Sequence, residues 1–225
     1  MTDKTIVSFL LDETGSMDAV RDKTVSGFNE YVTTLRRNDT PTLLRLMTFN
    51  TEGYTVVYDC EDIHSVADLA MESYRPRALT NLYDAIAKLV HDTEDYMKRM
   101  SQAPRVMCTI MTDGEENSSS EYTRAAIFKL IRDREKEGWA FVYLGANQDA
   151  WAASESIGID RRNSANYQAD APNLPFDEWT EIFGSERLTG ALLDRLTHHV
   201  HVLEMNGESF RLKQSRKSNQ PPATD

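Results

Sequence analysis

Short apolar segments rich in β-branched residues alternate along this chain with longer segments of helical periodicity. The segment 5–11, TIVSFLL, is apolar on both faces, as a strand buried in the middle of a parallel sheet must be. Apolar residues recur at helical spacing in the following segment, 17–37. Two further buried strands are expected at 104–113 and 139–146. The alternation predicts an α/β fold with a doubly wound, mostly parallel central sheet and helices on both faces.

One pair of strands breaks the parallel pattern. The segments 42–50 and 54–59 are separated by only three residues, so they must pair antiparallel and form a hairpin, which we expect at the sheet edge. Helices are expected at 65–73, 81–100, 120–138 and 149–159, and a weak edge strand is expected at 163–169.

The chain has 225 residues, enough for one buried core with a small appendage. We expect the α/β domain to span 1–171 and a C-terminal helical extension packed on it to span 172–210. The last residues, 211–225, are polar, basic and end in prolines, which predicts a disordered tail.

Charge and composition exclude several classes of function. The net charge of −11 has the wrong sign for attraction to nucleic acid or to an anionic membrane, so neither is expected as a partner. The sequence has no apolar run long enough for a membrane span, no signal-peptide pattern, and only two cysteines. These features predict a cytoplasmic location without a disulfide framework.

Three loops expected at the carboxyl ends of the strands carry oxygen-bearing side chains. Asp12, Thr14 and Ser16 follow the first strand, Thr80 precedes a long helix, and Asp113 follows a central strand. Ligands of doubly wound sheets bind at this edge of the sheet. Three hydroxyls and two carboxylates, without histidine or thiolate, suit Mg²⁺ or Mn²⁺ rather than zinc.

The same residues also have simpler interpretations. Asp12 or Ser16 could cap the first long helix, Thr80 could cap the helix that follows it, and Asp113 could be an ordinary turn residue. The coincidence of all three loops favours a cation site, and a vestigial site stays open.

The stretches LLDETGSM, LTNLYDAI and IMTDGEEN, in this order, resemble the von Willebrand factor type A (vWA) family and its metal-ion-dependent adhesion site, here between about Lys4 and Ala169. Thr14 stands where the family pattern has its first serine, and Ala78 and Leu79 stand where the family often has two glycines. Within the family, the chain looks most like small stand-alone members from bacteria and phages.

The resemblance implies roles for the site residues. The hydroxyls of Thr14, Ser16 and Thr80 would contact the metal directly, whereas Asp12 and Asp113 would act largely through water. The open metal position would then take a Glu or Asp side chain of a partner protein. The acidic residues expected beside the site, where they would take part in partner binding, are Glu13, Glu115 and Glu116.

On this basis we expect a divalent-metal-dependent protein-binding module that is not an enzyme. Two alternatives stay open. One is a Mg²⁺-dependent hydrolase or phosphoryl-transfer enzyme. The sequence argues against it, because it has no Gly-rich phosphate loop and no histidine or lysine in the three motif loops. The other is a structural assembly subunit with a vestigial metal site. The sequence does not determine the oligomeric state.

Overall fold

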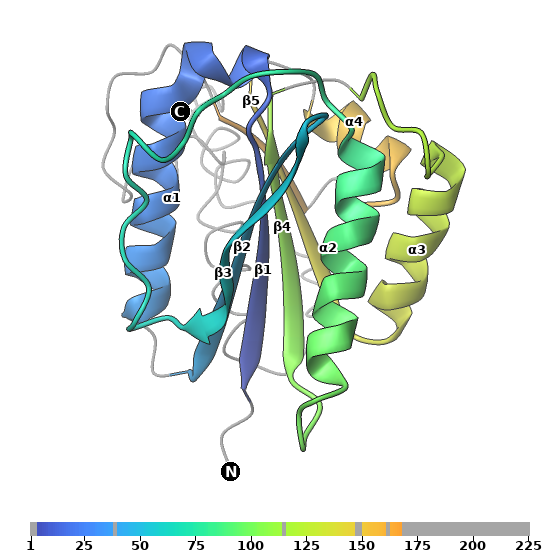
Figure 1. The fold of residues 1–225 in the computed structure, drawn as a ribbon. Helices are drawn as coiled ribbons and strands as arrows, with labels where there is room; N and C mark the ends of the chain where they lie inside the picture. The colour runs from blue at the N-terminus through green and yellow to red at the C-terminus, as the bar shows by residue number, and fades with distance from the viewer. Residues whose placement is uncertain (1–3, 38–39, 114–115, 147–149, 161–162, 168–225) are drawn as a thin grey trace, which may run out of the picture.

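The computed structural model describes residues 4–37, 40–113, 116–146, 150–160 and 163–167 (Figure 1). Its centre is a six-stranded sheet in the order β3-β2-β1-β4-β5-β6. The strands are β1 (Thr5–Asp12), β2 (Thr42–Asn50), β3 (Gly53–Asp62), β4 (Arg105–Thr112), β5 (Ala140–Ala146) and β6 (Ser164–Tyr167). The helices are the 3₁₀ helix η1 (Gly15–Val20) and the α-helices α1 (Arg21–Arg36), α2 (Leu82–Met97), α3 (Arg124–Lys136) and α4 (Ala150–Ser156).

The sheet has the predicted topology. All neighbouring strands pair parallel except β2 and β3, which form the expected antiparallel hairpin at one edge. The chain order reverses at β1, which pairs with β2 on one side and β4 on the other. The carboxyl ends of β1 and β4 therefore lie side by side at the point where such sheets bind ligands.

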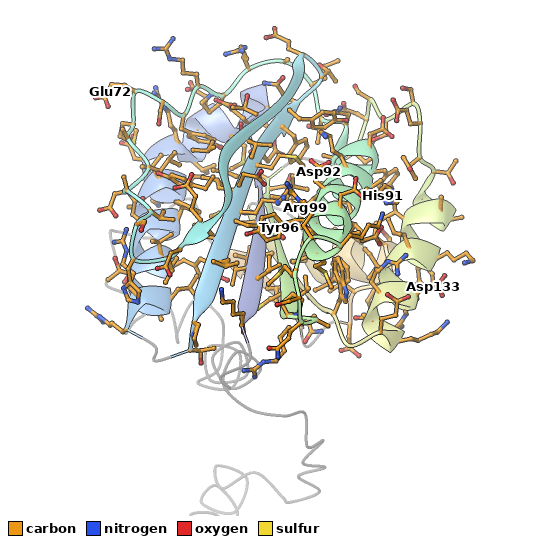
Figure 2. The ribbon with its side chains drawn as sticks, turned by 60° about the horizontal axis from the view of Figure 1, so that its bottom comes forward. Glu72, His91, Asp92, Tyr96, Arg99 and Asp133 are labelled. Carbon is orange, nitrogen blue, oxygen red and sulfur yellow. The ribbon has the colours of Figure 1, made fainter. Side chains whose placement is uncertain are left out.

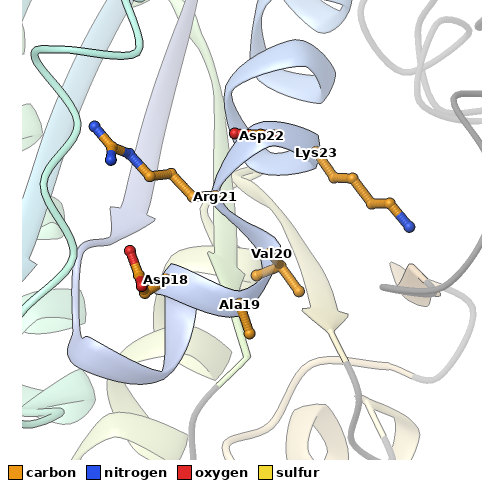
Figure 3. A pocket seen from close by; sticks show the side chains of 6 residues that line it. All are labelled: Asp18, Ala19, Val20, Arg21, Asp22 and Lys23. Carbon is orange, nitrogen blue, oxygen red and sulfur yellow. The ribbon is translucent and has the colours of Figure 1, made fainter.

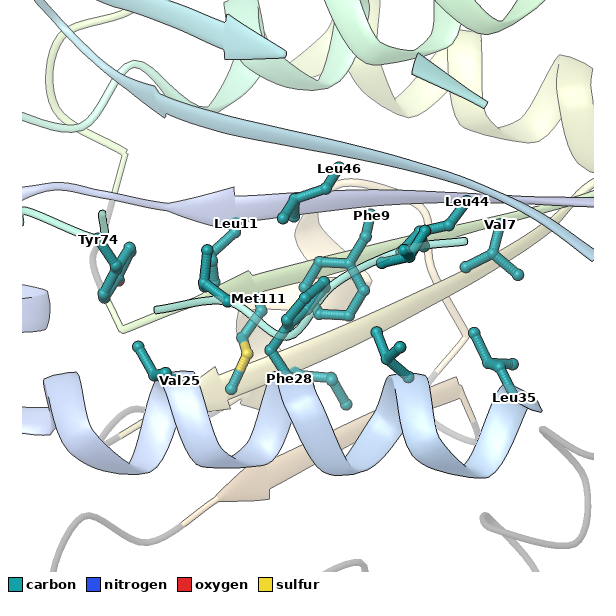
Figure 4. Packing of buried hydrophobic residues seen from close by; sticks show 14 of the residues in the cluster. Val7, Phe9, Leu11, Val25, Phe28, Leu35, Leu44, Leu46, Tyr74 and Met111 are labelled. Carbon is teal, nitrogen blue, oxygen red and sulfur yellow. The ribbon is translucent and has the colours of Figure 1, made fainter. Parts of the chain in front are cut away.

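Helices cover both faces of the sheet, with α1 on one face and α2 and α3 on the other (Figure 1). The α1 face is filled by Val7, Phe9 and Leu11 of β1 against Phe28 of α1, whose ring meets that of Phe9 edge to face with centroids 5.1 Å apart (Figure 4). Every residue of β1 is buried. This agrees with the sequence pattern, because a strand covered on both faces needs no polar alternation.

The residues between β3 and α2 form an extended strap (residues 63–79), so the helix expected at 65–73 is wrong. The strap lies along α1 and satisfies its backbone groups there instead of through helical bonds. Arg36 donates to the carbonyls of Ile63 and Val66, and Asn29 exchanges two hydrogen bonds with the backbone of Leu69. Side chains of the strap join the core under α1, which stabilises the extended path.

A polar group ties the edge hairpin to α2. Arg45 of β2 is 3% exposed and its guanidinium lies 2.6 Å from the carboxylate of Asp59 on β3. Asp92 and Tyr96 of α2, and Arg99 in the turn that follows it, lie close together (Figure 2). The ring of Tyr96 lies 5.9 Å from the guanidinium of Arg45 and 5.0 Å from that of Arg99. These partners make the burial of the Arg45 charge tolerable.

No helix within the described ranges is long and apolar enough to cross a membrane. The helical extension expected at 172–210 and the tail expected at 211–225 lie outside the described residues.

Replacing Phe28 with alanine tests the core on the α1 face. Phe28 is fully buried, so Phe28→Ala should lower the free energy of unfolding by about 3–5 kcal/mol, measured by urea denaturation. Phe128 of α3 is 41% exposed, and Phe128→Ala should cost less than about 1 kcal/mol. Equal losses in the two variants would contradict this assignment of the core.

Candidate functional site

Asp12, the last residue of β1, is buried and holds three segments together. Its carboxylate accepts a hydrogen bond from the main-chain N–H of Thr14 at 2.7 Å and another from the hydroxyl of Thr112 on β4 at 2.5 Å. Its own carbonyl accepts a bond from the hydroxyl of Tyr74, in the strap, at 2.5 Å. Both carboxylate oxygens and the main chain of Asp12 therefore fix the edge at which β1 ends.

The hydroxyls predicted as ligands lie beside this carboxylate. The Oγ atoms of Thr14 and Ser16 are 3.2 Å apart, and Ser16 donates a hydrogen bond of 2.7 Å to the carboxylate of Asp113. Asp12 and Thr14 are buried, Asp113 is half-buried and Ser16 is exposed. The structure thus joins four of the five predicted residues in an oxygen cluster (Asp12, Thr14, Ser16, Asp113) that is open on one side.

Thr80 reaches the same edge of the sheet through backbone contacts. The N–H of Gly15 donates to the carbonyl of Ala78 at 3.1 Å, and the N–H of Arg77 donates to the carbonyl of Glu13 at 2.9 Å. Thr80 follows directly in the chain and is 3% exposed. The end of the strap therefore runs alongside the loop that carries the oxygen cluster.

The capping alternatives are not realised in the structure. Val20 is the N-cap residue of α1 and Asn81 is that of α2, and neither makes a side-chain capping bond. The side chains of Asp12 and Ser16 are used within the cluster instead. Sequence analysis missed Thr112 and Tyr74, which hold Asp12. Thr112 could have been noticed beside Asp113, whereas the contact of Tyr74 depends on the path of the strap.

Burial perturbs the acid groups of the site. It raises the pKa of Asp12 from 3.8 to about 6, although the bonds from Thr112 and Thr14 act in the opposite direction. Burial also raises the pKa of Asp113, while the bond from Ser16 lowers it. The raised pKa values mean that the charged forms of these two neighbouring carboxyl groups are unfavourable, and a bound cation would stabilise them.

The chemistry of the cluster fits a hard divalent cation. Its donors are hydroxyl and carboxylate oxygens, the ligands that Mg²⁺ and Mn²⁺ prefer. Across the part of the chain that the structure describes, no three His, Cys, Asp or Glu side chains gather as a metal site. A cation here would therefore depend on the hydroxyls of Thr14, Ser16 and Thr80 as well as on the two carboxylates. Its identity as Mg²⁺ or Mn²⁺ stays a prediction.

Two of the three acidic residues predicted for partner binding accept hydrogen bonds from nearby main-chain N–H groups. The carboxylate of Glu13 accepts a bond from the N–H of Arg75 at 2.7 Å. That of Glu116 accepts bonds from the N–H groups of Ser118 and Ser119 at 2.8 and 2.6 Å. Glu115 lies outside the described residues. The predicted part of all three residues in partner binding stays a prediction.

A pocket of about 360 Å³ lies next to the cluster in sequence, at the turn from η1 into α1 (Figure 3). It is lined by the single continuous segment 18–23, and none of the five predicted ligands lines it. The oxygen cluster is therefore a feature of the open sheet edge rather than of this pocket.

Ala78 adopts a left-handed backbone conformation, with φ of 64°. The family pattern has glycine near this position, and the structure gives the reason, since only glycine adopts this conformation without a steric cost. The strain lies directly beside the cluster, because the carbonyl of Ala78 accepts the bond from Gly15.

Comparison with solved structures confirms the predicted fold. The manganese-loaded TRAP protein of Plasmodium vivax aligns with a TM-score of 0.53 and 14% identity over 75% of this chain and 70% of that chain. The VWA domain of SpRpn10 aligns with a TM-score of 0.54 and 12% identity over 80% of this chain and 95% of that chain. The chain thus contains a vWA-type fold, and identities this low show the fold alone.

Sequence comparison gives a different relationship. The family model described as IstB-like ATP binding protein matches residues 161–218. A protein of insertion sequence IS21 from Pseudomonas aeruginosa, named for ATP binding, is 45% identical over 114 residues, which are 51% of this chain and 41% of that protein. A similarly named protein of insertion sequence IS5376 from Geobacillus stearothermophilus is 48% identical over 44 residues, 20% of this chain and 18% of that protein. The chain spans less than half the length of these relatives.

These matches contradict two expectations from the sequence. A metal-dependent protein-binding module and the absence of enzymatic activity are both wrong, because the sequence relatives are named for ATP binding. The expectations depended on motifs between residues 12 and 113, whereas the family match lies at 161–218. The sequence pattern of that segment predicts only an edge strand, a helical extension and the start of a disordered tail, and the described residues cover only its part at 163–167.

Asp12→Asn tests the buried carboxylate. Asparagine can keep both hydrogen bonds, accepting from Thr14 and donating to Thr112, while it removes the charge. In the wild type, the stabilisation from a protonated Asp12 is present below pH 3.8 and is lost as the pH rises through about 6. In EDTA at pH 7, the variant should therefore be more stable, by up to about 3 kcal/mol.

Urea denaturation of both proteins between pH 4 and 7 measures this difference. Added Mg²⁺ should stabilise the wild type and have little effect on Asp12→Asn. A stability difference that does not change with pH would contradict the assignment.

Ala78→Gly tests the backbone strain beside the cluster. Glycine removes the steric cost of the positive φ, so the free energy of unfolding should rise by about 1 kcal/mol in thermal or urea denaturation. Ala125, exposed in the first turn of α3, is the matched control, because its backbone is helical and Ala125→Gly should lower stability by less than about 1 kcal/mol. A loss of stability in both variants would show that Ala78 is not strained.

Proposed function

We propose that this chain serves an insertion sequence as an ATP-binding protein and takes ATP as its divalent-cation complex at the oxygen cluster. The observation that carries the proposal is the match of residues 161–218 to the IstB-like ATP binding family, together with the relative from insertion sequence IS21. Because the chain spans 41% of that relative, ATP binding by this chain is itself part of the proposal.

The cation would bring the phosphates to the cluster. Mg²⁺ rarely fills its shell with protein ligands and commonly binds through one or two carboxylates together with substrate phosphates. Here the two carboxylates are those of Asp12 and Asp113, and the exposed hydroxyl of Ser16 marks the open side. This donor set supports a site that is shared between the protein and a phosphate ligand.

Two arginines at the end of the strap are suited to contact the phosphates. The main chains of Arg75 and Arg77 are hydrogen-bonded to the carboxylate and the carbonyl of Glu13, respectively, which places both beside the cluster loop. Both side chains are exposed, and Arg77 pairs with Glu52 at 2.6 Å, a contact that solvent weakens. Guanidinium groups bind phosphate oxygens in a fork geometry, and the sequence has no P-loop to supply this contact otherwise.

The acidic surroundings would make nucleotide binding depend on the cation. Asp12, Asp113 and Glu13 would repel phosphate oxygens when no cation lies between them. Hydrolysis of ATP is the reaction class that fits. A bound divalent cation supplies neutralisation of charge on the phosphate oxygens, and the chain would supply orientation through Arg75 and Arg77.

Binding of ATP to the whole chain tests the proposal. Isothermal titration calorimetry should detect binding in Mg²⁺ and none in EDTA. Asp113→Asn should weaken the affinity by about tenfold to a hundredfold, the usual effect of disturbing a residue that orients a metal. Asp133→Asn is the control, because Asp133 lies on α3 and pairs only with exposed lysines in the described residues (Figure 2). Release of phosphate, measured on the same proteins, should follow the order of the affinities.

Two outcomes would contradict the proposal in different ways. If the wild type binds no ATP in Mg²⁺, the nucleotide proposal is wrong. If Asp113→Asn binds ATP as well as Asp133→Asn does, the nucleotide lies elsewhere and the proposed position is wrong.

A further inference from the structure

The loop after β4 forms hydrogen bonds with both the N–H and the carbonyl of Thr80. The N–H of Thr80 donates to the side-chain Oδ1 of Asn117 at 3.2 Å. The carbonyl of Thr80 accepts bonds from the N–H groups of Asn117 and Ser118 at 3.1 and 3.0 Å. The hydroxyl of Ser118 also donates to Oδ1 of Asn117 at 2.7 Å, which orients the amide. Asn117 therefore contacts the peptide groups on both sides of the Thr80 side chain.

The same loop is also hydrogen-bonded to the start of α2. Glu116 accepts a bond from the N–H of Tyr83 at 3.0 Å, in addition to those from its own loop. Asp84 is buried and its carboxylate accepts bonds from Ser120 and Tyr122, each at 2.8 Å. Asn117 thus acts from a rigid base, because charged acceptors in a buried position make strong hydrogen bonds.

The predicted ligands come from separate segments that are far apart in sequence. Ser16 and Asp113 are joined directly by a hydrogen bond, whereas Thr80 arrives from the strap. Fixing both peptide groups of a residue fixes the direction of its side chain. Mg²⁺ demands near-ideal geometry, so a ligand held within a few tenths of an ångström binds far better than a loose one.

We propose that Asn117 is a positioning residue that holds the hydroxyl of Thr80 at the cation site without touching the cation. The inference rests on the cation site of the proposed function and adds how one of its ligands is held. It makes cation affinity depend on a hydrogen bond between two loops.

Two substitutions at Asn117 separate positioning from general stability. Asn117→Ala removes the acceptor for the N–H of Thr80 and should weaken Mn²⁺ binding by about tenfold or more. Asn117→Asp keeps that oxygen acceptor and should restore the affinity to within about threefold of the wild type.

Asn29 of α1 offers a matched control. Its side chain also exchanges hydrogen bonds with the backbone of the strap, at Leu69, with distances of 2.7 and 3.0 Å. Asn29→Ala removes a similar set of contacts with the strap. These contacts are made at Leu69, which precedes Thr80 by eleven residues. It should lower the melting temperature about as much as Asn117→Ala does, and leave Mn²⁺ affinity unchanged.

The experiment is titration of the whole chain with Mn²⁺ alone, followed by electron paramagnetic resonance, with thermal unfolding measured in EDTA. Weakened binding in Asn117→Ala, rescue in Asn117→Asp and no change in Asn29→Ala would support the proposal. Wild-type affinity in Asn117→Ala would overturn it, as would an equal loss of affinity in Asn29→Ala. A wild type that binds no Mn²⁺ would overturn both the cation site and this inference, independently of the result with ATP.

Discussion

The site depends on one buried carboxylate at the end of the central strand. Asp12 binds the loop that follows it, the neighbouring strand through Thr112, and the strap through Tyr74. Each contact brings a different part of the chain to the same edge of the sheet. Burial makes the negative charge of Asp12 unfavourable, as its raised pKa indicates. The carboxylate that organises the site is therefore also an unfavourable buried charge, and a bound cation would neutralise it.

The sheet could be predicted because its signals are local. The apolar run at 5–11 and the three-residue connection after 42–50 were sufficient to predict a buried central strand and an antiparallel edge hairpin. The strap could not be predicted in the same way. Its apolar residues have a pattern compatible with a helix, but side chains of α1, including Asn29 and Arg36, bind its backbone in an extended form. Long-range contacts here override local periodicity.

The members of the oxygen cluster could be predicted because their motifs are short, whereas the residues that hold the surrounding loops could not. Tyr74 and Asn117 act through contacts that cross between loops, and nothing in the adjacent sequence marks them. The prediction of the function was wrong for another reason. One fold can serve many functions, and residues 161–218, which resemble ATP-binding proteins of insertion sequences, show in the sequence only a weak strand pattern, helical periodicity and a polar tail.

The way in which α1 holds the strap has a consequence for sequence drift. Most of the acceptors on the strap are backbone carbonyls, which every residue type possesses. Substitutions along the exposed positions of the strap therefore leave the anchoring intact, whereas Arg21, Asn29 and Arg36 carry it with their side chains. The strap side of this contact therefore tolerates substitution better than the helix side does. As far as this anchoring is concerned, the exposed positions of the strap can vary while the three helix positions are constrained, which is opposite to a contact in which the loop carries the recognition residues.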